Sequence, residues 1–411
     1  MFSPSRRVAG LFLACLSIGT ITPLHAEQAR LNAFLTLSAF DPEVALWARA
    51  ETYAAHNLGV VHAGQTVELN LFLKHFGISN EGQSKVSYSI EMTDPQGTLV
   101  QRGENLSALD QPMNATRTFL TANEVAILEF PQAYAAGTYQ IRALVTDHVK
   151  DETITVGAFV KLERLDAVAG FASEAEYESW LTHYYLDPMP GRALKAFLEN
   201  AAPMQDPALR SWAQIIFYYE IFAANDWLQT QLIADFDSLT ELQRANAVFL
   251  LGLLKYRDPA FFAALDSDLA ELYHDARNLR LPDPTDAIHS PEALEMHWFR
   301  FFASGEIRSL QPIAQLLEYA AYEGTLREVA DIAESLTDAQ REAALKDVLF
   351  QSARWSLAGN CIEHPAVHRF CTYLAETGQL SEDAEAVMVD LLRSVRQELA
   401  ADAVVSESQG G

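Results

Sequence analysis

Few residues in this sequence have types and spacing that could bind a metal ion. His364 and His368 are four positions apart, with Glu363 just before them. A helix would place both imidazoles on one face, where they could share a metal. However, Pro365 favours a helix start and places His364 at the cap. No His-Glu-x-x-His motif and no third ligand accompany the pair. We interpret them as cap and surface histidines and predict no metal site.

Catalytic patterns are equally sparse. His289, Glu295 and His297 cluster beside Trp298 and are interpreted as the exposed polar face of a helix start. The sequence contains no Gly-x-Ser-x-Gly nucleophile motif and no phosphate-binding glycine loop. Carboxylates are so abundant that no pair stands out for acid/base chemistry. The sequence therefore predicts no catalytic residue, no cofactor-binding residue and no cofactor.

A binding function would depend on aromatic side chains in the helical part of the chain. Most members of a helical aromatic stripe pack in the core, whereas an exposed Tyr or Trp can anchor a protein partner. Arg354, beside Trp355, has the same two interpretations. The candidate partner-binding aromatics are Trp180, Tyr184, Tyr185, Tyr218 and Trp298.

The first residues indicate export. Arg6 and Arg7 precede an apolar run over 8–21, and Ala26 is a small residue at a cleavage position. Residues 1–26 are therefore predicted to be a secretory signal peptide. The run is too short for a membrane-spanning helix, which needs about 20 residues. A lipoprotein acylated at Cys15 is the alternative. We expect a periplasmic or secreted protein with no transmembrane segment after the signal peptide.

Only Cys361 and Cys371 remain after cleavage at Ala26. Both lie near one predicted helix–helix turn, and an oxidising compartment favours a disulfide between them. Two buried thiols are the alternative.

Charge and composition limit the class of partner. The chain has 411 residues, 49% of them hydrophobic, so it can bury the cores of two or three domains. Its formal charge of −26 is unsuited to a nucleic-acid backbone, and no basic stripe compensates for it. We expect a protein or peptide of the cell envelope as partner and no nucleic acid.

The N-terminal part has a strand pattern. Between residues 44 and 162 apolar and polar residues alternate, as in Val67, Leu69, Leu71 and Leu73. Turn residues interrupt the runs, and no long helical pattern occurs among them. Six or seven short strands predict an immunoglobulin-like antiparallel β-sandwich over 27–168.

From Phe171 the pattern is helical. Ser173 and Glu176 predict a capping box. Proline is expected to open helices at Asp206-Pro207, Asp258-Pro259, Ser290-Pro291 and His364-Pro365. The pattern predicts an all-α, irregular helical-hairpin solenoid over 169–400 and a disordered tail over 401–411.

One short stretch occurs twice. "EIFAAND" and "RFFASGE" place Phe222 and Phe302 at equivalent positions, 80 residues apart, and Asn225 and Gly305 three residues later. Both Asn and Gly accept the left-handed conformation that often follows a helix. We interpret the repeat as a structural joint between paired helices rather than as a duplicated active site. A weaker copy lies at 374–378.

Several segments resemble known families. "HAGQTVELNLFLK" and "AAGTYQIRALVTD" resemble strands of immunoglobulin-like and fibronectin-like domains in exported bacterial proteins. The helical part resembles tetratricopeptide-like and other α-solenoid repeats, although the regular consensus is missing. "ARWSLAGNCIEHPAVHRFC" resembles a block of exported bacterial proteins that carry both kinds of domain. The resemblance implies this architecture and implies no activity.

Together these patterns favour a non-catalytic protein of the cell envelope that acts in recognition or scaffolding. The alternatives are a hydrolase-like envelope enzyme with a site in the interdomain cleft, or an acylated assembly factor.

Overall fold

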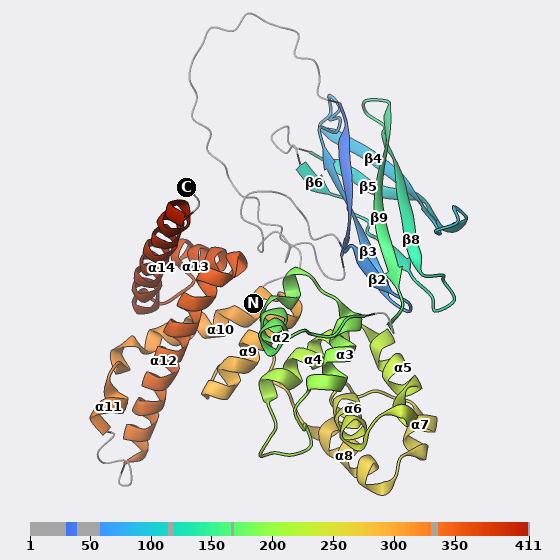
Figure 1. Cartoon of the computed structure of the whole chain (residues 1–411). Helices are drawn as coiled ribbons and strands as arrows, with labels where there is room; N and C mark the ends of the chain where they lie inside the picture. The colour runs from blue at the N-terminus through green and yellow to red at the C-terminus, as the bar shows by residue number, and fades with distance from the viewer. Residues whose placement is uncertain (1–29, 39–57, 114–118, 166–167, 330–335, 410–411) are drawn as a thin grey trace, which may run out of the picture.

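The computed structural model describes residues 30–38, 58–113, 119–165, 168–329 and 336–409. The predicted signal peptide and Cys15 lie outside these residues. The described chain has an N-terminal β region followed by a C-terminal helical region (Figure 1). Strands end at Glu163, and the first described helix begins at Glu174. In the described residues, no helix is both long enough and apolar enough to cross a membrane.

The β region contains two sheets. In one sheet β3 lies between β1 and β6 and also pairs with β7; the other has the order β2-β9-β8-β4-β5. All pairs are antiparallel except β2 with β9. The described residues hold nine strands instead of the expected six or seven, because β2, β6 and β7 are too short to show alternation. The strands are β1 (Asn32–Ser38), β2 (Val60–His62), β3 (Thr66–Lys74), β4 (Gln83–Thr93), β5 (Leu99–Pro112), β6 (Phe119–Thr121), β7 (Ala126–Glu129), β8 (Gly137–Asp147) and β9 (Glu152–Glu163).

Alternation along the strands builds one shared core. Leu69 and Leu71 of β3 belong to the same buried cluster as Tyr88 of β4, Ile141 of β8 and Val160 of β9. These residues come from both sheets. Because successive side chains point to opposite faces of a strand, each sheet gives its apolar face to this cluster.

The helical region begins with α2 (Glu174–His183), α3 (Pro190–Asn200), α4 (Trp212–Ala224), α5 (Asp226–Ala234), α6 (Glu241–Leu253), α7 (Pro259–Ala264) and α8 (Ser267–Asn278). It continues with α9 (Pro291–Ser304), α10 (Leu310–Gln315), α11 (Thr325–Val329), α12 (Asp338–Glu363), α13 (Pro365–Thr377) and α14 (Glu382–Gln409). Short 3₁₀ helices are η2 (Tyr184–Leu186), η3 (Phe236–Ser238), η4 (Ile307–Ser309) and η5 (Leu316–Tyr322). The most extensive helix pairs, α4 with α9 and α6 with α8, join elements that are not consecutive in the chain.

Most of the predicted helix starts are confirmed. The Ser173 hydroxyl accepts a hydrogen bond from the Glu176 N–H, and Pro259, Pro291 and Pro365 all lie in the first turn of a helix. Capping oxygens and proline satisfy or remove the N–H groups that have no partner at a helix start.

Two predictions in this region are wrong. Pro207 begins a turn and not a helix, because the Asp206 carboxylate accepts the Ala208 N–H at 2.9 Å and closes a local turn. The next helix, α4, is capped by Ser211 instead. Residues 401–409 also continue α14, where a disordered tail was expected.

The repeated stretch forms two helix ends that lie against each other, since α4 packs on α9. Phe222 and Phe302 are both buried, and Gly305 has the predicted left-handed conformation, with φ 68°. Asn225 does not: its φ is −134°. Its side chain caps the helix instead, because the amide nitrogen donates to the Ile221 carbonyl at 2.8 Å. In the third copy Gly378 is left-handed, with φ 64°.

Candidate functional site: a cleft between the two regions

The five candidate partner-binding aromatics are core residues, which corrects the expectation that they anchor a partner. Trp180 packs edge-on against Phe217, with ring centroids 5.5 Å apart. Burial raises the pKa of Tyr184, Tyr185 and Tyr218. Stripes of helical aromatics pack inward because they bury large apolar areas. None of the five has more than 8% of its surface exposed: Trp180, Tyr184, Tyr185, Tyr218 and Trp298.

A different tryptophan lies at the surface. Trp355 on α12 is 82% exposed, and the neighbouring Arg354 pairs with Glu323 at 3.2 Å. The sequence pattern could not distinguish this residue from the buried aromatics, because all of them lie in helical stretches of similar composition.

Cys361 lies in the last turn of α12, and Cys371 lies in α13. Both side chains are buried, and both are free thiols in this structure. The hydrogen bond between the two thiols, together with burial, raises the pKa of Cys371 well above its usual value. The thiols are therefore neighbours, and a disulfide between them stays a prediction.

The histidines are less exposed than the sequence suggested. His364 caps α13 as predicted, but it is fully buried, and its Nδ1 lies 3.2 Å from the Tyr185 hydroxyl. Burial, and the neighbouring His183, lower the pKa of His364 to about 4. His297 is also buried, which corrects its assignment to an exposed face. Within the described ranges, no group of three or more His, Cys, Asp or Glu residues is placed to hold a metal.

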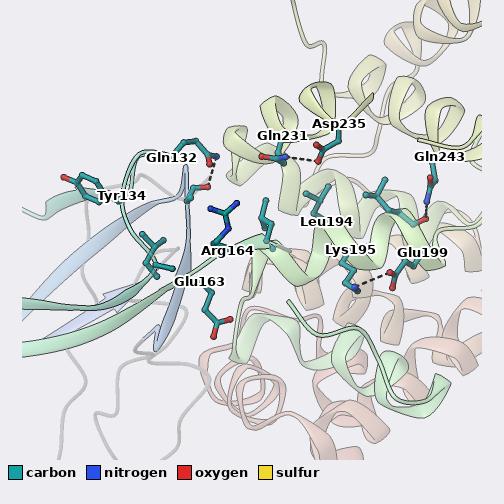
Figure 2. Close-up of a pocket in the computed structure, with 16 residues that line it drawn as sticks. Gln132, Tyr134, Glu163, Arg164, Leu194, Lys195, Glu199, Gln231, Asp235 and Gln243 are labelled. Atoms are coloured by element: carbon teal, nitrogen blue, oxygen red, sulfur yellow. Dashed lines mark hydrogen bonds and ion pairs between the residues drawn. The ribbon is translucent and has the colours of Figure 1, made fainter. Parts of the chain in front are cut away.

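A cleft of about 620 Å³ lies where the β region meets the helical region (Figure 2). Its β side comes from the turns after β2 and β7 and from the end of β9. Its helical side comes from α3, the end of α5 and the start of α6. The lining residues are Ala63, Gln132, Tyr134, Ala136, Leu162, Glu163, Arg164, Leu165, Gly191, Leu194, Lys195, Leu198, Glu199, Gln231, Asp235 and Gln243.

Close packing beside the cleft holds the two regions together. The buried ring of His62, at the end of β2, lies against Gly191 at the start of α3. A Cβ on Gly191 would lie only 2.6 Å from Nε2 of His62, so the contact requires glycine. Trp227 of α5 lies on the same side, with its ring centroid 6.2 Å from that of His62. Burial lowers the pKa of His62.

Hydrogen bonds fix the polar groups on the β side. Gln132 Nε2 donates to the Ala63 carbonyl at 3.1 Å, which ties the turn after β7 to the turn after β2. The ring of Tyr134 stacks on Tyr139 with centroids 5.7 Å apart. Glu163 at the end of β9 pairs with Lys161 at 2.5 Å. These contacts give the β wall a defined set of donors and acceptors.

The helical side is organised in the same way. Lys195 and Glu199 pair at 3.4 Å, one turn apart on α3. Gln231 Nε2 donates to the Asp235 carboxylate at 2.8 Å at the end of α5. Gln243 Nε2 donates to the Leu198 carbonyl, also at 2.8 Å, and so connects α6 to the end of α3.

Sequence reasoning missed this cleft as a set of residues. Its members extend from Ala63 to Gln243, so only the docking of the two regions brings them together. Leu194 and Leu198, four apart on α3, carry the one local signal, an apolar stripe whose surroundings the sequence does not reveal.

Comparisons with known proteins assign no family. No protein-family model matches the chain, and no curated protein matches it. Among solved structures, the CARDB domain of a Pyrococcus furiosus protein, solved in complex with di-metal ions, is 13% identical; the match covers 34% of this chain and 95% of that one, with a TM-score of 0.19. An immunoglobulin-like protein from Pseudomonas aeruginosa is also 13% identical, over 34% of this chain and 100% of its own, with a TM-score of 0.18.

A family 123 glycoside hydrolase from Clostridium perfringens, studied for glycolipid glycan hydrolysis, matches over 33% of this chain and 28% of its own, at 13% identity and a TM-score of 0.18. TM-scores this low carry no argument about this chain.

Proposed function

We propose that this protein is a non-catalytic recognition or scaffolding component of the cell envelope, and that the cleft binds a protein or peptide partner. The observation that supports this most is the composition of the cleft. Two separately built regions contribute to a space of about 620 Å³, which combines leucine side chains with fixed polar groups. Concave sites of this size and mixed polarity are typical of ligand binding.

The contacts of the cleft suit an extended segment of a partner. Leu165 and Leu198 are partly exposed and offer apolar surface, and the amides of Gln132 and Gln231 also line the cleft. Both amide nitrogens donate to acceptors within the protein, which fixes the amide oxygens as acceptors for a ligand. Groups that are already ordered lose little entropy on binding, so they favour recognition.

The finer architecture is part of the proposal. The shared core of the two sheets supports an immunoglobulin-like β-sandwich. The tetratricopeptide-like, irregular α-solenoid of the helical region rests on its sequence pattern, and the non-consecutive pairs α4 with α9 and α6 with α8 depart from a regular stack of hairpins. Export rests on the sequence of residues 1–26. The mass of the mature N-terminus distinguishes cleavage after Ala26 from an assembly factor acylated at Cys15.

Site-specific photo-crosslinking tests the proposal. A photoreactive residue at Gln132, which lines the cleft, should capture a specific envelope protein in the producing cell. The matched control is Thr153, exposed at the opposite end of β9, where the same probe should give no such product. Identical crosslinked products from both positions would contradict a binding site in the cleft.

The position of the cleft also favours one alternative, a hydrolase-like envelope enzyme. Glu163, Glu199 and Asp235 place three carboxylates in an interdomain cleft, where acid/base chemistry would be located. Release of soluble fragments from purified envelope polymer, abolished by both Glu163→Gln and Glu199→Gln, would favour the enzyme. If these two variants lose the partner crosslink and the wild-type protein releases no soluble fragments, recognition is favoured.

A further inference from the structure

We infer that the cleft receives a cationic side chain, a lysine or arginine of the bound segment, with the Asp235 carboxylate as its acceptor. This inference rests on the proposed function, because it names the chemistry that the partner presents to the same cleft. It follows from differences among the three carboxylates that line the cleft.

Two of the carboxylates already have a cation. Glu199 pairs with Lys195 at 3.4 Å, and Glu163 pairs with Lys161 at 2.5 Å. Asp235 is half-buried and accepts only the neutral Gln231 amide at 2.8 Å. No cation pairs with Asp235 in the part of the chain that the structure describes. A half-buried carboxylate that has only a neutral donor gains most from a cation supplied by a ligand.

The backbone around Asp235 favours the same sign of charge. Asp235 is the C-cap of α5, so it lies where the carbonyl groups of that helix give a negative end. Glu199 lies in the last turn of α3, on the same wall of the cleft. Both carboxylates therefore lie at the carbonyl end of a helix, where a positive charge is favoured.

The rest of the cleft fits the stem of such a side chain. Leu194 and Leu198 lie one turn apart on α3 and line the cleft together with Leu162 and Leu165. Lysine and arginine pack their methylene stems on apolar surface while the charged head stays at a polar rim. Of these four, Leu165 and Leu198 are partly exposed, and a stem over them would bring its head group to the polar helical wall.

One lining group fixes the orientation. Asp235 follows α5 and lies on the helical side of the cleft (Figure 2). A bound cation is attracted by Asp235, so the head group faces the helical wall. The formal charge of −26 adds a long-range attraction for basic segments.

Peptide pools with one fixed position test the inference on the full mature chain. Each pool is a blocked decapeptide with neutral flanks and with lysine, arginine, norleucine or glutamate at the centre. Binding is measured by fluorescence polarisation at low salt. We expect the lysine and arginine pools to bind about tenfold more tightly than the norleucine pool, as one charge-assisted contact predicts.

Asp235→Asn keeps the shape of the side chain. It should reduce the affinity for the lysine pool to the affinity measured for the norleucine pool. The matched control is Asp237→Asn, an exposed carboxylate two residues further on that does not line the cleft, and it should change nothing. Unfolding curves of both variants confirm that each one folds.

The outcomes separate the inference from the proposed function. Equal binding of all pools, or an unchanged lysine preference in Asp235→Asn, overturns the inference, and a specific crosslink at Gln132 then still supports recognition. Absence of pool binding together with a Gln132 crosslink overturns the inference alone. Absence of both overturns the inference and the proposed function.

Discussion

Helices α4 and α9 end in similar residues, but the backbone leaves the two helices in different conformations. After α9, Gly305 is left-handed, and its N–H donates to the Phe301 carbonyl at 2.6 Å. After α4, Asn225 stays at negative φ, and its side chain caps the Ile221 carbonyl. The difference shows that similar residues mark a helix end without fixing how the chain leaves it.

The element that comes after each helix explains the difference. The next helix, α5, begins directly at Asp226, and the Asn225 carbonyl already accepts the Leu228 N–H at 3.0 Å. Asn225 is therefore the C-cap of α4 and also the N-cap of α5, so its backbone angles have to suit both helices. After Gly305 the chain passes through Glu306 before η4, so a left-handed residue can redirect it.

The two helix ends also pair with each other. Glu220 and Arg300 occupy equivalent positions in the repeat, and their side chains form a salt bridge with an N–O distance of 2.6 Å. Burial raises the pKa of Glu220, and the attraction of Arg300 opposes this effect. Equivalent positions with opposite charges fit a structural joint between α4 and α9.

The largest expected effect in this comparison comes from the two phenylalanines. Phe222→Ala and Phe302→Ala should each lower the free energy of unfolding by about 3–5 kcal/mol, because both rings are buried. Chemical denaturation measures the change. The matched control is Phe159→Ala, whose ring is 61% exposed and whose loss should cost about 0.5 kcal/mol or less. Unchanged stability in either joint variant would contradict the structural interpretation.

The second effect is a loss of stability at low pH, and it involves only the end of α9. His364 lies against Phe302, with ring centroids 5.3 Å apart, and its folded-state pKa is about 4 against an ordinary 6.5. A lowered histidine pKa means that the unfolded chain binds the proton more readily. The stability contribution is therefore complete above pH 6.5 and is lost as the pH falls towards 4, by about 3 kcal/mol in all.

Comparison with His364→Gln isolates this contribution from the other titrating groups. The difference in unfolding free energy between the wild type and the variant should narrow by about 3 kcal/mol between pH 7.5 and pH 4. A difference that stays constant with pH would show that His364 does not titrate abnormally.

A smaller effect is expected at Gly305. Gly305→Ala should lower the free energy of unfolding by about 1 kcal/mol, because a Cβ is disfavoured at φ 68°. Thermal or chemical unfolding measures it. A neutral result would indicate that the α9 end can adopt another conformation.

The smallest effect is expected at Asn225, where the backbone has a negative φ and the side chain provides the cap. Asn225→Ala meets no left-handed strain, so it should cost only the hydrogen bond to Ile221, about 0.5–1 kcal/mol. Asn225→Gly should cost more than Asn225→Ala, because glycine also adds freedom to the unfolded chain. If Asn225→Gly lowered the stability less than Asn225→Ala, the result would favour a left-handed conformation at this position and contradict the negative φ.

The sequence predicted the features that depend on neighbours in the chain. The strand β3 follows from alternating residues such as Leu69 and Leu71, and the starts of α9 and α13 follow from proline. The helix start predicted at Pro207 was wrong because the Asp206 carboxylate accepts a hydrogen bond from the Ala208 N–H, and this turn competes with the helix. Local pattern alone cannot decide such a competition.

The candidate site was not predictable, because its residues are gathered by tertiary structure. Gln132 and Asp235 belong to different regions and meet at the cleft only because β2 docks on α3 at Gly191. The burial of Trp180 and the exposure of Trp355 likewise depend on which helix faces which neighbour. Residue type alone does not contain that information.

Filling the cleft tests the central claim of partner recognition most directly. Lys195→Trp places a large ring on the lining, and Lys85→Trp places the same ring on an exposed position of β4 outside it. Each variant is combined with the photoreactive residue at Gln132, and the yield of the partner crosslink is measured. We predict that Lys195→Trp abolishes the crosslink while Lys85→Trp preserves it, with similar unfolding midpoints. A crosslink that survives a filled cleft would contradict partner recognition there.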